Sequence, residues 1–152
     1  MQIVFDHEKL KVYQTAVQFI RWLQGFEDRI KKSRTIFNQL DRASISIALN
    51  IAEGNGKYSQ RDRCRFFDIA RGSAFECAAA LDVLAAKTLL SESEILTGKE
   101  MLRKIVSMLV GLIKRHSDNC ICESTADYGT DLKKYERDLE QEQEQEQEQE
   151  QE

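Results

Sequence analysis

The sequence predicts an all-α protein, an antiparallel up-down-up-down four-helix bundle followed by a disordered acidic C-terminal tail. The 152 residues contain no proline, which favours long uninterrupted helices. Apolar residues recur at spacings of three and four in four successive segments of residues 1–116, and these spacings match the period of a helix. Residues 117–152 lack this pattern. We therefore expect a bundle domain over residues 1–116 and a low-complexity tail over residues 117–152.

The first two helices are predicted from apolar periodicity and from capping residues. The first is expected from His7 to Ile30 with Asp6 as its N-cap. Its apolar stripe consists of Val12, Ala16, Phe19, Leu23, Phe26 and Ile30. The second is expected from Ile36 to Glu53, with Thr35 as its cap. Gly54 would close this helix in a left-handed conformation.

The start of the third helix and the start of the fourth helix are each predicted from a pair of residues with capping-box spacing. Ser59 and Asp62 would open the third helix, which we expect to end near Leu89. Its predicted inner row is Phe66, Ala70, Ser73, Cys77, Leu81, Leu84 and Thr88. Ser91 and Glu94 would open the fourth helix. One of its faces carries Ile95, Leu102, Ile105, Leu109, Leu112 and His116.

The second helix has more apolar surface than one bundle face can bury. Leu40, Ala43, Ile47 and Ile51 form one stripe, and Ile45, Leu49 and Ala52 form another. The two stripes are separated by about 200° around the helix. A helix that is apolar on both sides is buried on both sides or packs against another subunit. The pattern therefore predicts a homo-oligomer, although small residues such as Ser44, Ser46 and Ala48 also suit close packing within one bundle.

Charge is distributed unevenly along the chain. Residues 1–116 hold 19 Lys and Arg against 13 Asp and Glu, whereas residues 117–152 hold 3 against 13. From Glu140 to Glu152 the tail is a strict alternation of Glu and Gln, a pattern that disfavours a helix and buries no core. The tail could be a repeat expansion that only improves solubility. Alternatively, it could compete internally with nucleic acid for the basic surface of the bundle.

The N-terminus and the apolar runs indicate a cytoplasmic protein without a membrane segment. No run of about 18 apolar residues occurs, and Met1 to Asp6 lacks the features of a secretory signal. The four cysteines are too few and too irregularly spaced for a secreted disulfide framework.

The chain contains three segments, Asn38 to Gly56, Phe5 to Gln14 and Arg65 to Ser73, that resemble one bacterial family, the four-helix-bundle proteins encoded by intervening sequences within 23S ribosomal RNA genes. The longest segment runs from Asn38 to Gly56 and includes Asn50-Ile51-Ala52-Glu53-Gly54. The others are Phe5 to Gln14 and Arg65 to Ser73, the latter followed by Glu76. More distantly, the chain is similar to the accessory variability determinant of diversity-generating retroelements. It departs from the family at Asp41-Arg42, where many members have paired arginines, and in its Glu-Gln tail.

The resemblance implies a cytoplasmic bundle that assembles into a ring, with a pentamer as the expected size, and that binds nucleic acid. The distant resemblance adds a reverse transcriptase or another basic protein as an expected partner. The family has no established reaction, and it also allows that the protein is a passenger of its mobile element.

Side-chain patterns typical of enzymes are not found, so we expect no catalysis and no cofactor. A di-metal bundle needs Glu-x-x-His pairs, but neither His7 nor His116 follows a Glu at that spacing. His116, Cys120 and Cys122 match no standard zinc pattern.

Four polar residues lie among apolar ones in the second and third helices: Asn50, Glu53, Arg71 and Glu76. We expect them to form an interhelical network, for instance through a Glu53–Arg71 ion pair. Alternatively, they form a polar patch at a subunit interface.

Two basic clusters are the candidate functional sites. The link between the first two helices carries Arg29, Lys31, Lys32 and Arg34. The loop and first turns of the third helix carry Lys57, Arg61, Arg63 and Arg65, with Tyr58 among them. Such cations bind phosphates with a salt-dependent affinity, and a ring would multiply them. We therefore expect a non-enzymatic accessory protein that binds RNA or DNA through its loop ends. The alternatives are solvated helix ends without this role, and a scaffold that binds a protein partner.

Overall fold

The computed structural model describes residues 4–117, and every regular element in this range is a helix. A short 3₁₀ helix, η1 (Asp6–Lys9), precedes α1 (Lys11–Gln24) and α2 (Glu27–Ile30). The long helices α3 (Arg34–Gly56), α4 (Gln60–Ala86) and α5 (Glu92–Ser117) follow. The chain divides into two units, Met1–Cys120 and Ile121–Glu152, and the described residues all belong to the first. Of the tail predicted over residues 117–152, Ser117 is described and ends α5, and the rest lies outside the described residues.

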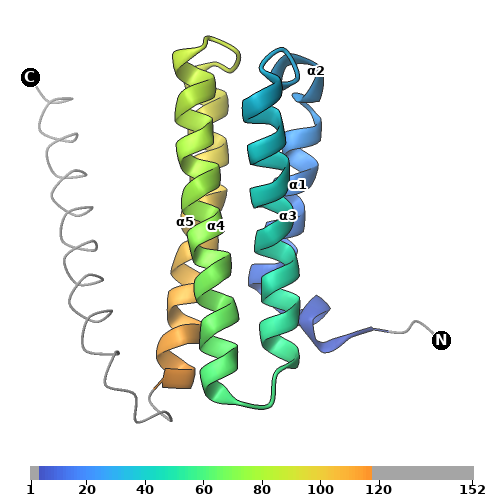
Figure 1. The fold of residues 1–152 in the computed structure, drawn as a ribbon, viewed down its shortest axis with the longest axis vertical. Coiled ribbons are helices and arrows are strands. Elements are labelled where there is room, and N and C mark those ends of the chain that lie inside the picture. The colour runs from blue at the N-terminus through green and yellow to red at the C-terminus, as the bar shows by residue number, and fades with distance from the viewer. Residues whose placement is uncertain (1–3, 118–152) are drawn as a thin grey trace, which may run out of the picture. The chain divides into compact units, whose positions relative to one another are not determined.

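The predicted antiparallel bundle is formed by α1, α3, α4 and α5, which we call the four long helices. Helix α4 packs against α3 and α5, and α1 packs against the same two helices from the other side. Figure 1 shows α3 and α4 side by side, with α1 behind α3 and α5 behind α4. The link through α2 and the α4–α5 loop lie at one end of the bundle, and the α3–α4 loop lies at the opposite end (Figure 1). None of the helices described has the length and apolar content needed to span a membrane.

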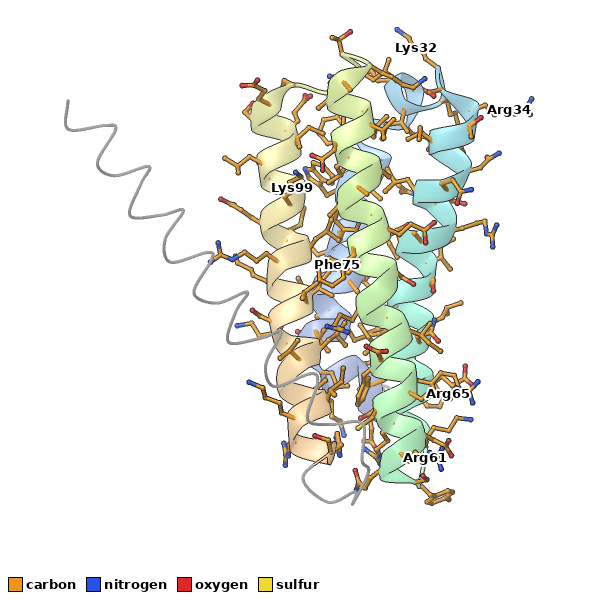
Figure 2. All side chains as sticks on the ribbon, turned by 60° about the vertical axis from the view of Figure 1, so that its left-hand side comes forward. Lys32, Arg34, Arg61, Arg65, Phe75 and Lys99 are labelled. Carbon is orange, nitrogen blue, oxygen red and sulfur yellow. The ribbon has the colours of Figure 1, made fainter. Side chains whose placement is uncertain are left out.

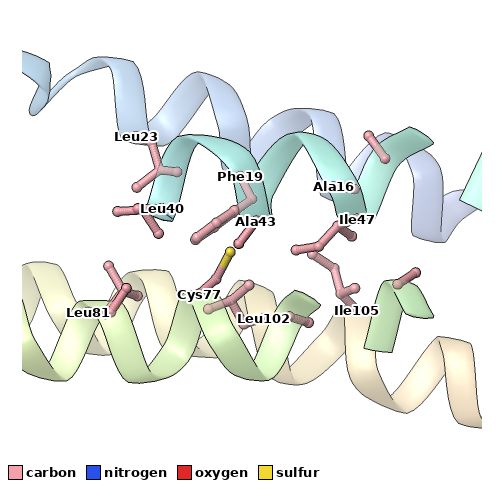
Figure 3. Close-up of a cluster of buried hydrophobic side chains, with 14 of the residues drawn as sticks. Ala16, Phe19, Leu23, Leu40, Ala43, Ile47, Cys77, Leu81, Leu102 and Ile105 are labelled. Carbon is pink, nitrogen blue, oxygen red and sulfur yellow. The ribbon is translucent and has the colours of Figure 1, made fainter. Parts of the chain in front are cut away.

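Apolar side chains from the four long helices meet along the bundle axis. Figure 3 shows Phe19 from α1, Ile47 from α3, Cys77 from α4 and Ile105 from α5 within one cluster. These four side chains are fully buried. The predicted stripes therefore supply most of the core, because a helical period of 3.6 residues places each stripe on one face.

The first predicted helix is three elements rather than one. Leu10 is extended, with φ −72° and ψ 125°, and separates η1 from α1. Asp6 is the first residue of η1 instead of an N-cap, and the cap contact is made by Glu8, whose carboxylate accepts a hydrogen bond from the Phe5 N–H at 2.8 Å. A second interruption follows Gly25, a residue of low helix propensity. It lets Ile30 return to the core.

Two predicted caps of the second helix are wrong. Helix α3 begins at Arg34, with Ser33 rather than Thr35 in the N-cap position. Gly54 lies inside the helix and is not left-handed. A Cβ at Gly54 would lie 3.0 Å from Phe66 Cβ and 3.0 Å from the Phe67 ring. The glycine therefore serves the close approach of α3 and α4 rather than a helix end.

The other two predicted helix starts are confirmed. The Ser59 hydroxyl accepts a hydrogen bond from the Asp62 N–H at 3.3 Å. At α5, the Ser91 hydroxyl accepts from the Glu94 N–H at 3.3 Å, and the Glu94 carboxylate accepts from the Ser91 N–H at 2.8 Å. This reciprocal pair is a complete capping box.

The inner row predicted for the third helix is correct in its middle and wrong at both ends. Phe67 is fully buried, whereas Phe66 is only half-buried. At the other end α4 stops at Ala86, and Thr88 adopts a left-handed conformation with φ 55°. Thr88 is therefore exposed, and Leu90 enters the core in its place.

Candidate nucleic-acid interface

The two predicted basic clusters lie at opposite ends of the bundle. Figure 2 places Lys32 and Arg34 at one end, and Arg61 and Arg65 at the other. Antiparallel packing produces this separation, because successive connections alternate between the two ends. The clusters therefore form two separate surfaces of the bundle.

In the first cluster, Arg29 holds two segments of the bundle together. Its Nη1 and Nη2 donate to the Glu94 carboxylate at 2.9 and 2.8 Å, and its Nε donates to the Leu89 carbonyl at 3.0 Å. The hydrogen bonds from Arg29 and from the Ser91 N–H lower the pKa of Glu94 to about 2. The same contact raises the pKa of Arg29. Arg29 therefore joins α2 to the start of α5. This structural role is not visible when basic residues are grouped by their position in the sequence.

The remaining residues of the first cluster differ in their contacts. Lys31 pairs with Glu27 one turn earlier, and this hydrogen bond raises the pKa of Lys31. Its ammonium also lies 5.4 Å from the centroid of the Phe37 ring. Lys32 and Arg34 are exposed. We therefore take Lys32 and Arg34 as the phosphate-binding candidates of this cluster.

In the second cluster, the cations surround the start of α4. Lys57 Nζ and Arg65 Cζ lie 4.9 and 6.0 Å from the centroid of the Phe66 ring. Lys57 also pairs with Glu53 at 3.4 Å. Arg63 Nε donates to the Lys57 carbonyl at 2.7 Å and so ties the loop to α4. Arg61 is exposed in the first turn of α4.

The last turn of α5 extends this cluster, and we did not expect its cations to contribute. The His116 ring bonds through Nδ1 to Gln60 Oε1 and lies 6.0 Å from the Phe67 ring. Cys64 Sγ donates to the Ile113 carbonyl at 3.6 Å. These contacts bring Lys114 and Arg115 to the start of α4. Helix direction alone gives this result, because the fourth helix of an antiparallel bundle ends beside the start of the third.

We call the combined surface the basic end, and it contains Lys57, Arg61, Arg63, Arg65, Lys114 and Arg115. Asp62 is the one carboxylate within the same three segments of the described chain, residues 57–59, 60–65 and 114–117. The positive potential acts on a neighbouring titratable group. Burial, Arg63 and Arg115 together lower the pKa of His116. The basic end thus concentrates six cations at one end of a rigid bundle.

A polar network joins α3 and α4, but it includes only Asn50 of the four predicted residues and its other members are serines. Asn50 Nδ2 donates to the Ser46 hydroxyl at 3.0 Å, and the Ser46 and Ser73 hydroxyls are 2.8 Å apart. The Ser73 hydroxyl donates to the Ile69 carbonyl at 3.0 Å. Because each hydroxyl has one proton, Ser46 must donate to Ser73. The chain of donors therefore runs from α3 into α4.

The other members of the predicted network have different contacts. Glu53 pairs with Lys57 in its own helix, and Arg71 pairs with Asp68 at 2.9 Å in its own helix. The expected Glu53–Arg71 pair is replaced by these two. Glu76 is exposed on α4. The small size of serine predicts close packing, and the sequence carries no signal for the hydrogen bond between Ser46 and Ser73.

Helices α3 and α4 also expose apolar side chains. Ile45 and Leu49 on α3 are 42% and 63% exposed. Ile69, Phe75 and Val83 are exposed on α4, and Figure 2 shows Phe75 on its outer surface. We call these five residues the apolar face. Of the second apolar stripe predicted for the second helix, Ile45 and Leu49 are thus exposed, whereas Ala52 is half-buried.

These features define the chain as a small all-α protein with a four-helix bundle, one basic end and an exposed apolar face. Among residues 4–117, no three His, Cys, Asp or Glu side chains are grouped as a metal site. The chain belongs to the 23S rRNA-intervening sequence protein family, whose model matches residues 8–111. The resemblance found in the sequence is therefore confirmed.

A solved structure supports the fold assignment. The chain is similar to a protein of unknown function from the S23 ribosomal protein family of Bacteroides thetaiotaomicron. The TM-score is 0.61 at 20% sequence identity, and the match covers 68% of this chain and 98% of that chain. At this identity the likeness shows the fold alone. No curated protein matches the chain.

Proposed function

We propose that this protein is a cytoplasmic, non-enzymatic homo-oligomer that binds RNA or DNA through its basic end. The gathering of six cations from three segments around one bundle end supports this proposal. Lysines and arginines that contact phosphates release counterions, so binding is strong at low salt and depends little on sequence. Arg61, Arg65, Lys114 and Arg115 are exposed and accessible to a phosphate backbone.

The apolar face supports the oligomeric part of the proposal. A soluble helix usually presents polar residues to water, whereas α3 and α4 expose Ile45, Leu49 and Ile69. Contact with a second copy would bury these side chains, and a closed ring is one arrangement that does so in every subunit. We propose a pentamer, the size that the family resemblance implies. A ring would repeat the basic end once per subunit and strengthen its field.

The test compares variants at the two ends of the full chain. Fluorescence anisotropy measures binding of labelled RNA and DNA between about 50 and about 200 mM salt, and light scattering gives the mass. Replacing Arg61 and Arg65 by Ala should weaken binding and lower the salt slope by about 2. The matched control replaces Lys32 and Arg34 by Ala, which removes two exposed cations at the opposite end. Equal losses in both variants would contradict a site at the basic end.

A second candidate function is favoured by the same apolar face. The protein would then be a scaffold that presents this face to a protein partner with an apolar surface of its own. A chain that binds neither RNA nor DNA at low salt would support the scaffold and exclude the nucleic-acid proposal. A monomeric mass would remove the oligomeric part of either function.

A further inference from the structure

Tyr58 is an aromatic residue that the bundle does not use. It lies in the loop between α3 and α4, and its relative exposure of 102% means that its side chain packs against nothing. Within the described chain, no aromatic ring or cation lies against its ring. Aromatic side chains normally contribute to stability by burying their large apolar surface. Because Tyr58 buries none, both faces of its ring are accessible to a ligand.

The backbone that carries Tyr58 is nevertheless fixed. The Lys57 N–H donates to the Gly54 carbonyl at 3.2 Å, and Arg63 Nε donates to the Lys57 carbonyl at 2.7 Å. On the other side, Ser59 caps α4. These contacts hold both neighbours of Tyr58. The ring is therefore presented to solvent from a short loop that is anchored at both ends.

Cations adjoin this exposed ring along the chain. Lys57 precedes Tyr58 directly, and Arg61 lies two residues beyond Ser59, in the first turn of α4. Phe66 supports Lys57 and Arg65, since both cationic groups lie over its ring. An exposed aromatic ring next to positioned cations is the combination with which proteins bind single strands, because bases stack on the ring while cations hold the phosphates.

We propose that the basic end binds single-stranded nucleic acid, with an unpaired base stacked on Tyr58 and adjacent phosphates bound by Lys57, Arg61 and Arg65. This inference rests on the proposed function and specifies its ligand. Along a duplex the base faces are covered by neighbouring base pairs, so a stacking residue has access only to the terminal pairs. Cations bind the phosphates of a duplex and of a single strand alike. The preference for a single strand therefore depends on stacking of an unpaired base on Tyr58.

The experiment uses the full chain and four probes of equal length. Oligouridylate and oligothymidylate offer unpaired bases on RNA and DNA, an abasic oligonucleotide offers phosphates without bases, and a blunt RNA duplex offers paired bases. Tyr58→Ala should weaken binding of oligouridylate and oligothymidylate by about 5- to 100-fold. The matched control, Tyr58→Phe, keeps the ring and should retain affinity. Neither variant should change the melting temperature, because the side chain is fully exposed.

The abasic probe and the duplex separate stacking from charge. Both should bind the wild type through phosphates alone, and Tyr58→Ala should leave their affinities unchanged. Binding of the two unpaired probes that is insensitive to Tyr58→Ala would overturn the stacking proposal while leaving the proposed function intact. An equal loss for all four probes would also overturn it. If the wild type binds none of the probes at low salt, the proposed function itself fails.

Discussion

The indole of Trp22 lies directly against the backbone of Gly98, where α1 meets α5. A Cβ built at Gly98 would be 2.6 Å from Cη2 of Trp22 and 2.8 Å from Cδ1 of Leu81. Real Cβ atoms do not approach other atoms this closely. Gly98 is therefore required for the packing of α1 on α5, although glycine lowers helix propensity.

Gly98→Ala should destabilise the bundle. Overpacking costs about 1–3 kcal/mol, and the gain in helix propensity offsets about 1 kcal/mol of this. Urea unfolding followed by fluorescence of Trp22, the single tryptophan of the chain, measures the difference. Gly111→Ala is the matched control, since a Cβ there meets nothing within 4 Å, and it should raise stability by up to about 1 kcal/mol. A Gly98→Ala protein as stable as the Gly111→Ala protein would contradict the packing argument.

Glu94 should make the stability of the bundle depend on acidic pH. Contact with Arg29 and the Ser91 N–H lowers its pKa from 4.5 to about 2. The unfolded chain therefore binds this proton more readily than the folded chain. The carboxylate stabilises the fold fully above pH 4.5, and this contribution disappears as the pH falls toward about 2. Glu94→Gln should lower the free energy of unfolding at neutral pH, and its difference from wild type should shrink over this range.

Asp82→Asn is the control for Glu94. Asp82 pairs with Lys99 on the surface between α4 and α5, and exposed pairs contribute about 0–1 kcal/mol. Urea midpoints measured across the acidic range would therefore change little in Asp82→Asn. A difference between Glu94→Gln and wild type that stays constant from pH 4.5 to 2 would show that the Arg29 contact does not stabilise the carboxylate.

The hydroxyls of Ser46 and Ser73 should be energetically coupled. Each serine replaced by Ala removes the 2.8 Å hydrogen bond between α3 and α4, and a net loss of about 1 kcal/mol is expected. The double variant should lose less than the sum of the single losses, because the second replacement removes a hydroxyl already without its partner. Chemical unfolding of the four proteins gives the coupling energy. Additive losses would mean that the hydroxyls do not interact in solution.

The helical period predicted the bundle because burial follows it closely. Val12, Phe19, Ile47 and Ile105 were all assigned to the core from spacing alone, and all are buried. The errors fall where a tertiary contact overrides local preference. The sequence predicts Gly54 as the end of a helix. In the structure, the absence of a side chain at Gly54 leaves room for the Phe67 ring. No sequence pattern distinguishes these two uses of a glycine.

The candidate interface was only partly predictable for the same reason. Sequence proximity grouped Lys57 with Arg61, but it also grouped Arg29 with Lys32. Arg29 is committed to Glu94, which lies 65 residues away, and such pairs depend on the packing of distant helices. Conversely, Lys114 and Arg115 join the basic end only because α5 returns to it. The antiparallel order of the predicted helices is sufficient to place the end of the fourth helix beside the start of the third.

His116 should make the free energy of unfolding decrease as the pH falls below 6.5. It lies at the basic end, whereas Glu94 lies at the opposite end of the bundle. Burial, Arg63 and Arg115 lower its pKa from 6.5 in the folded chain. The unfolded chain therefore takes up the proton first, and stability is complete above pH 6.5 and declines below it. His116→Gln cannot titrate, so its urea midpoint should lose this pH dependence, whereas His7→Gln should keep it because His116 remains. An NMR titration of the His116 ring that gives a pKa above 6.5 would reverse the predicted sign, and it would show that Arg63 and Arg115 do not impose a positive potential at the basic end.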